Sequence, residues 1–134
     1  MNAELVRQIW LRAGRCCKYC RIRQDRDDSP FEIDHIIARK HGGPTVPGNL
    51  ALSCLHCNLH KGSDIASLDP LSRKLSPLFH PRRHNWARHF RWQGAVLVGR
   101  TAIGRVTVSL LNVNHPFRVR LREELIAADH FPPA

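Results

Sequence analysis

The stretch Ser53–Gly62, "SCLHCNLHKG", holds two Cys, two His, an Asn and a Lys within ten residues. Its cysteines, Cys54 and Cys57, form a C-x2-C pair, and a second such pair, Cys17 and Cys20, lies upstream. Two C-x2-C turns present four thiolates that can complete a tetrahedron around Zn²⁺, and a closed site of this kind is structural. The alternative is a set of reduced, buried cysteines whose spacing arose by chance. We expect one structural zinc site with a large insert between its two halves.

The bulk properties of the chain limit its partners and its compartment. The 134 residues carry 21 Lys+Arg against 11 Asp+Glu, a formal net charge of +10 that suggests a polyanionic partner. No apolar run reaches the roughly 20 residues that cross a bilayer, so we expect no membrane partner. The N-terminal segment lacks the apolar core of a signal peptide, which favours a cytoplasmic protein. Five cysteines argue against a disulfide framework, and Cys16 is left outside the zinc site.

The pattern of apolar and turn-forming residues predicts one α+β domain over 1–134. The elements expected in chain order are a helix over Ala3–Ala13, strands over 31–38 and 49–53, a helix that begins near Asn58 and runs through Leu68, a hairpin around Gly94, a helix from Thr101 to about Asn112 and a helix over Pro116–Ala128. The apolar residues of the last helix fall on one face, which we expect to pack on the core: Phe117, Leu121, Leu125 and Ala128.

The insert between the two cysteine pairs carries a recognisable set of residues at fixed spacings. They are Asp34-His35, Gly42-Gly43, Asn49-Leu50 and Cys54-x2-Cys57-Asn58-x2-Lys61. This pattern resembles the HNH nuclease family, and more narrowly the branch in which a four-Cys zinc site clamps the ββα-metal hairpin. The resemblance covers residues 15–64. It implies a zinc-stabilised ββα-metal (HNH/His-Me finger) core, to which residues 65–134 add a basic extension with a hairpin and two helices.

The resemblance implies a role for each motif residue. His35 matches the general base that activates water for attack on phosphorus. Asp34 matches a carboxylate ligand of a single catalytic divalent cation, Mg²⁺ or another. Asn49 matches the middle Asn, which orients His35 or braces the loop through backbone hydrogen bonds. Asn58 matches the second ligand of the cation.

The end of the motif leaves an alternative open. His60 lies near the third motif position and could be the cation ligand in place of Asn58, as in branches of the family that end in His. We favour Asn58, because the "C-N-x-x-K" register fixes it directly after the zinc clamp. Lys61 would then contact phosphate.

The chemistry of the motif supports the same interpretation and raises one difficulty. An imidazole with a pKa near neutrality can take a proton from water, and two protein oxygens leave Mg²⁺ with open positions for water and phosphate. However, neighbouring residues on a regular strand point to opposite faces. Asp34 and His35 can therefore serve one site only if the strand twists or frays there, or if the cation lies beyond its end.

A basic and aromatic segment follows in the extension, which carries 11 Lys+Arg against 4 Asp+Glu. In "FHPRRHNWARHFRW" (79–92), three His interleave with Arg82, Arg83, Arg88 and Trp86, and we favour a phosphate-contacting strip over a second metal site. The alternative is a solvated basic face whose Trp residues belong to the core. The residues expected to bind nucleic acid are Lys40, Lys61, Arg82, Arg83 and Arg88.

Together these patterns predict a metal-dependent endonuclease that hydrolyses phosphodiester bonds in DNA, with RNA left open as a substrate. The alternative function is a non-catalytic zinc-ribbon module that binds nucleic acid. A third possibility is that the basic half docks on a larger phage or defence assembly. The intact set Asp34, His35, Asn49 and Asn58 favours the nuclease, because a pure binding module does not need it.

Overall fold

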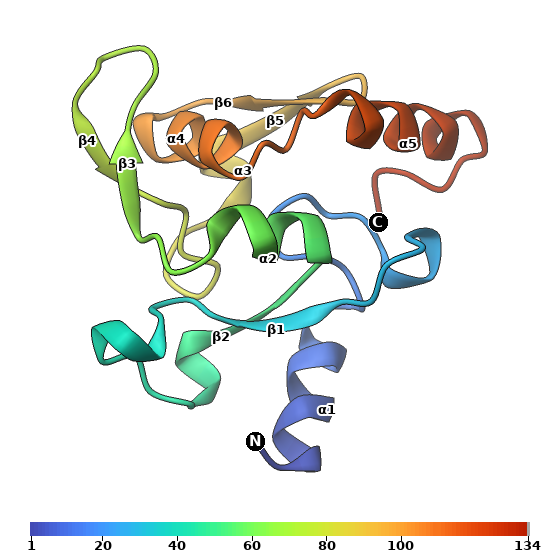
Figure 1. Ribbon diagram of the computed structural model, residues 1–134. Coiled ribbons are helices and arrows are strands. Elements are labelled where there is room, and N and C mark those ends of the chain that lie inside the picture. The colour runs from blue at the N-terminus through green and yellow to red at the C-terminus, as the bar shows by residue number, and fades with distance from the viewer. Residues whose placement is uncertain (134) are drawn as a thin grey trace.

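The computed structural model of the chain describes residues 1–133 and shows a mixed α+β protein (Figure 1). The elements in chain order are α1 (Ala3–Arg12), η1 (Gln24–Arg26), β1 (Glu32–His35), η2 (Arg39–His41), η3 (Pro47–Asn49), β2 (Leu50–Ser53), α2 (Leu55–Lys61), β3 (Ala66–Leu68), β4 (Leu75–Pro77), α3 (Trp86–His89), β5 (Phe90–Gln93), β6 (Val96–Gly99), α4 (Ala102–Leu110) and α5 (Pro116–Ala127). Within the described residues, the strands form three two-stranded antiparallel sheets, each between consecutive strands.

The first hairpin and the helix after it form a ββα unit (Figure 1). In the β1–β2 pairing, Glu32 faces Ser53 and His35 faces Leu50. Helix α2 packs against β1, and α1 packs against β2, whose four residues are all buried. The Arg12 side chain at the end of α1 donates hydrogen bonds to the backbone of η3 and β2. The hairpin is therefore held between two helices, which buries most of its apolar side chains.

The expectation of a helix beginning near Asn58 is wrong at both ends. Helix α2 starts three residues earlier, because Cys54 caps it: the Cys54 Sγ atom accepts a hydrogen bond from the Cys57 N–H at 3.3 Å. The helix ends at Gly62, which has a φ of +51°. The residues expected to continue it pair as β3 with β4 instead. A cysteine cap is not among the usual N-cap signals, so the pattern alone placed the start too late.

The hairpin and the two helices expected in the extension are present, whereas β3, β4 and α3 were not expected. The predicted hairpin is confirmed as β5 and β6, which turn at Gly94 with a φ of +58°. The Thr101 Oγ1 atom accepts a hydrogen bond from the Gly104 N–H at 3.1 Å and caps α4, as predicted. A Cβ atom at Gly104 would lie 2.0 Å from the carbonyl oxygen of His89, so α4 can approach the preceding segment this closely only with glycine there.

The expected apolar face of the last helix is wrong in part. Leu121 and Leu125 pack against the core, but Phe117 is 74% exposed and Ala128 is also exposed. The most buried side chain of α5 is instead Arg122, which is 0% exposed. Apolar and basic residues alternate around this helix, so periodicity did not decide which face is buried.

One hydrophobic cluster runs through both halves of the chain. Its buried members from the first half include Ile9, Tyr19, Leu50 and Leu52, and those from the second half include Phe79, Phe90, Leu97 and Val106. The extension therefore packs on the ββα unit through shared apolar contacts. Among residues 1–133, no helix has the length and apolar character that crossing a membrane requires.

Candidate active site and zinc cluster

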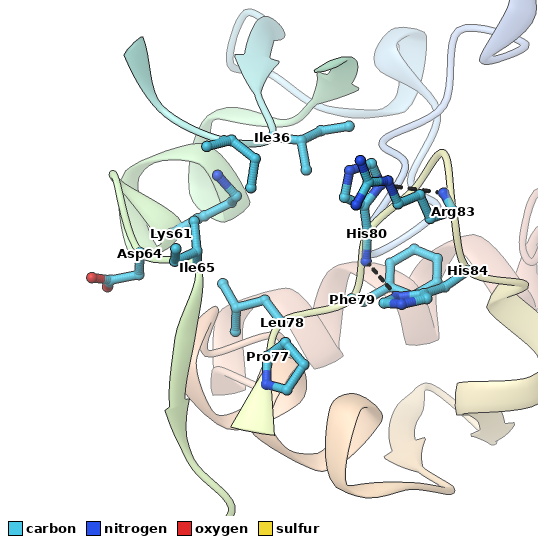
Figure 2. A pocket seen from close by; sticks show the side chains of 11 residues that line it. Ile36, Lys61, Asp64, Ile65, Pro77, Leu78, Phe79, His80, Arg83 and His84 are labelled. Atoms are coloured by element: carbon cyan, nitrogen blue, oxygen red, sulfur yellow. Dashed lines mark hydrogen bonds between the residues drawn. The ribbon is translucent and has the colours of Figure 1, made fainter. Parts of the chain in front are cut away.

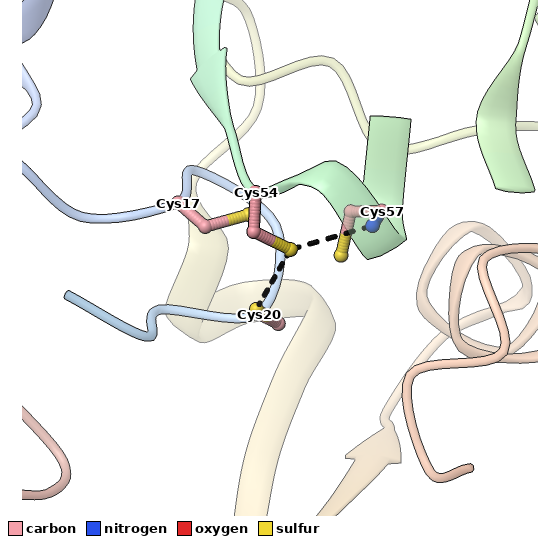
Figure 3. A group of neighbouring side chains, drawn as sticks. All are labelled: Cys17, Cys20, Cys54 and Cys57. Carbon is pink, nitrogen blue, oxygen red and sulfur yellow. Dashed lines mark hydrogen bonds between the residues drawn. The ribbon is translucent and has the colours of Figure 1, made fainter. Parts of the chain in front are cut away.

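The four cysteines of the two C-x2-C pairs meet in one buried cluster (Figure 3). The sulfur atoms of Cys17, Cys20, Cys54 and Cys57 all lie within 4.8 Å of one another. The separation of the Cys20 and Cys54 sulfurs is 3.8 Å. A tetrahedral zinc site with Zn–S bonds of about 2.3 Å has sulfur–sulfur separations of about 3.8 Å. The predicted grouping is thus confirmed, and both the donor set and the spacing fit a structural zinc ion.

The fifth cysteine stays outside the cluster. The Cys16 thiol donates a hydrogen bond to the carbonyl oxygen of Gly14 at 3.4 Å. Burial raises its pKa, which keeps it protonated and disfavours metal binding. Leaving Cys16 out of the ligand set therefore agrees with the structure.

Asp34 lies on the inner side of the hairpin and is only 4% exposed. Tyr19 donates a hydrogen bond from its hydroxyl to Oδ2 at 2.7 Å, and Lys61 donates from Nζ to Oδ1 at 3.2 Å. Burial raises the pKa of Asp34, while Lys61 and Tyr19 act in the opposite direction. Tyr19 sits between Cys17 and Cys20, so the zinc knuckle directly positions this carboxylate.

The position of Lys61 corrects the expectation that it contacts phosphate. Its side chain is 1% exposed, and Nζ also donates to the carbonyl oxygen of His35 at 3.3 Å. A buried ammonium needs a paired charge, which Asp34 supplies. The structure does not leave this ammonium where nucleic acid could reach it. Lys61 instead ties the end of α2 to the end of β1.

His35 is the last residue of β1 and is half-buried. Its Nε2 atom lies 2.9 Å from the Thr45 hydroxyl oxygen. Because β1 pairs regularly through His35, the side chains of Asp34 and His35 leave opposite faces of the strand. Their hydrogen-bond partners differ accordingly. His35 nevertheless ends β1, and its charge is among those that lower the pKa of Asp34 against the effect of burial, so the two side chains remain close enough to interact at the end of the strand.

Asn49 braces the loop that connects the two strands. Its Oδ1 atom accepts a hydrogen bond from the Ile37 N–H at 2.9 Å. Its Nδ2 atom donates to the carbonyl oxygens of Ile37 at 3.0 Å and Pro44 at 2.9 Å. A Cβ atom at Gly43 would lie 1.7 Å from the Ile37 oxygen and 2.9 Å from Asn49 Nδ2, so this motif glycine admits no side chain. These contacts fit the second role expected for Asn49, which is to brace the loop through backbone hydrogen bonds.

The two alternative cation ligands on α2 have different surroundings. Asn58 is half-buried and lies one turn before Lys61, on the side of the helix that faces Asp34. His60 is exposed, and its Nδ1 atom lies 2.8 Å from the carbonyl oxygen of His56. Its ring also packs on the ring of His56 at a centroid distance of 4.2 Å. Helical spacing therefore places Asn58 on the same face of α2 as Lys61, which contacts Asp34, whereas His60 is exposed beside His56.

The basic segment of the extension forms a loop over the ββα unit. His80 Nδ1 accepts hydrogen bonds from the backbone N–H groups of Arg82 and Arg83, and His84 Nδ1 accepts one from the His80 N–H. These bonds occupy nitrogens that a metal would need. Among residues 1–133, the four cysteines are the one group of three or more His, Cys, Asp or Glu side chains close enough to share an ion.

The remaining residues expected to bind nucleic acid differ in exposure. Arg83, Arg88 and Lys40 are exposed, whereas Arg82 is half-buried. Within the described residues, the Nε atom of Arg82 is buried without a hydrogen-bond partner. Trp86 packs on the core and donates a hydrogen bond from Nε1 to the Tyr19 carbonyl oxygen at 3.1 Å. This agrees with the alternative in which the Trp residues of the segment belong to the core.

A cavity of about 270 Å³ separates this loop from the ββα unit (Figure 2). Ile36 and Lys61 line it from the unit, and Leu78, His80 and Arg83 line it from the extension (Figure 2). A second cavity beside the hairpin loop shares Arg83 and His80. The extension therefore places a cation next to the residues that follow His35.

Sequence reasoning did not single out two residues that touch the motif side chains. Tyr19 is the buried partner of Asp34, and Thr45 is the partner of His35. The position of Tyr19 inside the first C-x2-C pair was a usable signal, since a knuckle fixed by zinc holds its inner residues rigidly. Thr45 lies in the Gly/Pro loop, where nothing in the pattern marked it.

Comparisons with known proteins agree with this geometry. The family model "HNH endonuclease" matches residues 17–64, the segment from the first zinc ligand to the end of the ββα unit. Septu protein PtuB from Bacillus thuringiensis is 27% identical over 100 residues, which is 73% of this chain and 36% of that protein. The chain thus spans about a third of the length of this curated relative. No solved structure gives a significant match. Residues 17–64 of this chain are thus similar to the HNH endonuclease family.

Proposed function

We propose that this protein is a metal-dependent endonuclease that hydrolyses phosphodiester bonds in DNA, with His35 as the general base. The observation that carries the proposal is the HNH match over the segment that contains both cysteine pairs, the hairpin and α2. The net charge of +10 supports a polyanionic substrate. HNH domains are associated with nucleases, and the residues below assign the chemistry to particular side chains.

The surroundings of His35 suit a base. In the tautomer in which Nε2 donates to the Thr45 hydroxyl, Nδ1 is the basic nitrogen. Partial exposure gives water access to the ring. Nδ1 would take the proton of a water molecule as the oxygen attacks phosphorus. Asn49 contributes indirectly, because it holds the backbone that follows His35.

The residues assigned to the catalytic cation are Asp34 and Asn58. A carboxylate and an amide oxygen are ligands that Mg²⁺ accepts, and a bound cation would neutralise charge on the phosphoryl oxygens. Each Asp34 oxygen accepts one hydrogen bond from a side chain and so keeps a lone pair for another partner. A cation that binds Asp34 must therefore share this carboxylate with the Lys61 ammonium or displace that ammonium.

Contacts with the substrate are assigned to exposed cations around the hairpin. Arg83 lines both cavities beside the hairpin loop, Lys40 lies in that loop, and Arg88 is on α3. Guanidinium and ammonium groups bind phosphates of the backbone without reading the base sequence. Arg82 would contribute through the field of its charge more than through contact, because it is half-buried.

The alternative of a non-catalytic binding protein also has an observation in its favour. The buried Lys61–Asp34 ion pair already neutralises the carboxylate that the nuclease needs for its cation. A domain that only binds nucleic acid could keep this ion pair intact at all times. The zinc cluster and the basic surface would then be the functional parts.

The test compares nicking and binding in the same proteins. Supercoiled plasmid is incubated with Mg²⁺ or Mn²⁺ and either wild type, His35→Ala, or His130→Ala as a matched exposed-histidine control. The nuclease proposal expects metal-dependent nicking by wild type and the control, a loss of roughly 100-fold or more in His35→Ala, and equal DNA binding in all three. If all three bind DNA and none nicks it, the binding module is the better description.

A further inference from the structure

One arginine of α5, Arg118, contacts the cysteine cluster, and a second, Arg122, is buried on the same helix. The Arg118 Nη2 atom donates to the Cys54 sulfur at 3.5 Å and lies 4.0 Å from the Cys20 sulfur. Its Nη1 atom donates to the Asp27 carboxylate at 3.0 Å, and the side chain is only 13% exposed. Within residues 1–133, the Nε atom of Arg118 is buried without a partner. This guanidinium thus bridges one carboxylate and two sulfurs of the metal site.

Arg122 follows one helical turn later and is fully buried. Its Nε and Nη2 atoms donate to the carbonyl oxygens of Ala95 and Val113, at 2.8 and 3.0 Å. These partners are neutral, and the ring of Trp92 lies 5.3 Å from the guanidinium carbon. In the described part of the chain no carboxylate pairs with Arg122, and its Nη1 atom has no partner. A buried cation in this state requires an anion nearby.

Besides Asp27, which pairs with Arg118, the anionic group beside α5 is the cysteine cluster. Burial and the charge of Arg118 lower the pKa of Arg122, and the thiolates of Cys20, Cys57 and Cys54 act in the opposite direction. Binding of zinc releases the thiol protons, and the loaded site is then negative because four thiolates outweigh the charge of the ion. That charge is itself buried, so it is costly without cations beside it. The buried arginines require an anion nearby, and the buried metal-loaded cluster requires cations nearby.

We propose that Arg118, with the buried charge of Arg122 one helical turn behind it, balances the charge of the metal-loaded cysteine cluster, so that metal binding and docking of the C-terminal helix stabilise each other. The arginines belong to the extension, and the cysteines belong to the HNH domain. By linkage, metal binding strengthens docking of α5 by the same factor by which docking strengthens metal binding. The role is independent of whether the domain cuts nucleic acid.

The first test measures zinc affinity by competition with a chromogenic chelator. Outer partners of metal ligands typically change affinity by about 10- to 100-fold when they are removed. Arg118→Met is expected to weaken zinc binding by at least roughly tenfold. Arg118→Lys keeps the charge but not the forked geometry, so its affinity should fall between those of Arg118→Met and wild type. Arg120→Met, on the exposed side of the same helix, is the control and should match wild type.

The second test measures amide hydrogen exchange of residues 116–127 in zinc-saturated protein. Exchange in this helix should be faster in Arg118→Met than in the Arg120→Met control, because the helix docks less tightly. Arg122→Met should behave like Arg118→Met where it folds. If it does not fold, the two Arg118 variants decide the outcome.

Two results would overturn the proposal. One is a zinc affinity of Arg118→Met within about twofold of the control, since outer partners of this kind are expected to matter by at least tenfold. The other is equal affinity and equal exchange for Arg118→Met and Arg118→Lys, because charge would then not be the property that matters.

Discussion

Replacing Lys61 by Met tests the buried ion pair at the centre of the ββα unit. Met has a similar length, so the change removes the charge without opening a large cavity. Lys61 and Asp34 are 1% and 4% exposed, and their charged atoms lie 3.2 Å apart. Breaking such a pair from one side costs about 3–5 kcal/mol, because the remaining charge stays buried without a partner. We expect the free energy of unfolding to fall by about this amount at neutral pH.

The loss should depend on pH in a defined direction. Burial already raises the pKa of Asp34 despite Lys61, and removing Lys61 raises that pKa further. The folded variant then binds a proton more readily than the unfolded chain does. The stability of the variant should therefore rise as the pH falls through the folded pKa of Asp34, and the gap to wild type should narrow.

The assay is urea unfolding of zinc-saturated protein at pH 8 and pH 5. Lys74→Met, an exposed lysine, is the control and should change stability by less than about 0.5 kcal/mol. The double variant Lys61→Met with Asp34→Asn should lose less than the sum of the two single variants, by about 1 kcal/mol or more. A loss below about 1 kcal/mol, or a gap that widens at pH 5, would refute the reasoning.

Three other changes give sharp expectations. Asn49→Ala removes three hydrogen bonds from a residue that is 6% exposed, so it should lower the free energy of unfolding by about 3 kcal/mol in thermal or urea unfolding. Gln93→Ala is the exposed-amide control, and a loss for Asn49→Ala no larger than that of Gln93→Ala would contradict the bracing role. Cys57→Ser should abolish zinc binding and tertiary structure together, as followed by zinc release and near-UV circular dichroism, because structural zinc contributes folding free energy; a folded, metal-free variant would argue against it. Arg82→Ala with Arg83→Ala should weaken DNA binding and reduce the slope of log affinity against log salt by up to about two, and an unchanged slope would remove both residues from the interface.

The parts of the fold that depend on local spacing were predictable, and those that depend on tertiary packing were not. The cysteine pairs and the glycines of the motif act over a few residues, so their pattern located the cluster and the hairpin. The burial of Lys61 depends on how α2 crosses β1, which no local pattern encodes. The start of α2 was missed because a thiol caps it.

The C-terminal helix α5 also shows that its local pattern could not identify which side chains are buried. Its apolar residues suggested a buried stripe, yet Arg122 is buried and Phe117 is exposed. Hydrophobicity failed as a guide because the surface that α5 covers includes a cluster of thiols and backbone carbonyls, which accept hydrogen bonds. Only the assembled fold reveals that this surface favours guanidinium groups over apolar ones.

The contact at Gly43 restricts how the protein can vary over evolutionary time. Even a methyl group there would overlap the Ile37 oxygen, so no single substitution is neutral at this site. The path of the chain between β1 and β2 is thus fixed by a backbone contact, not by a side chain that another side chain could replace.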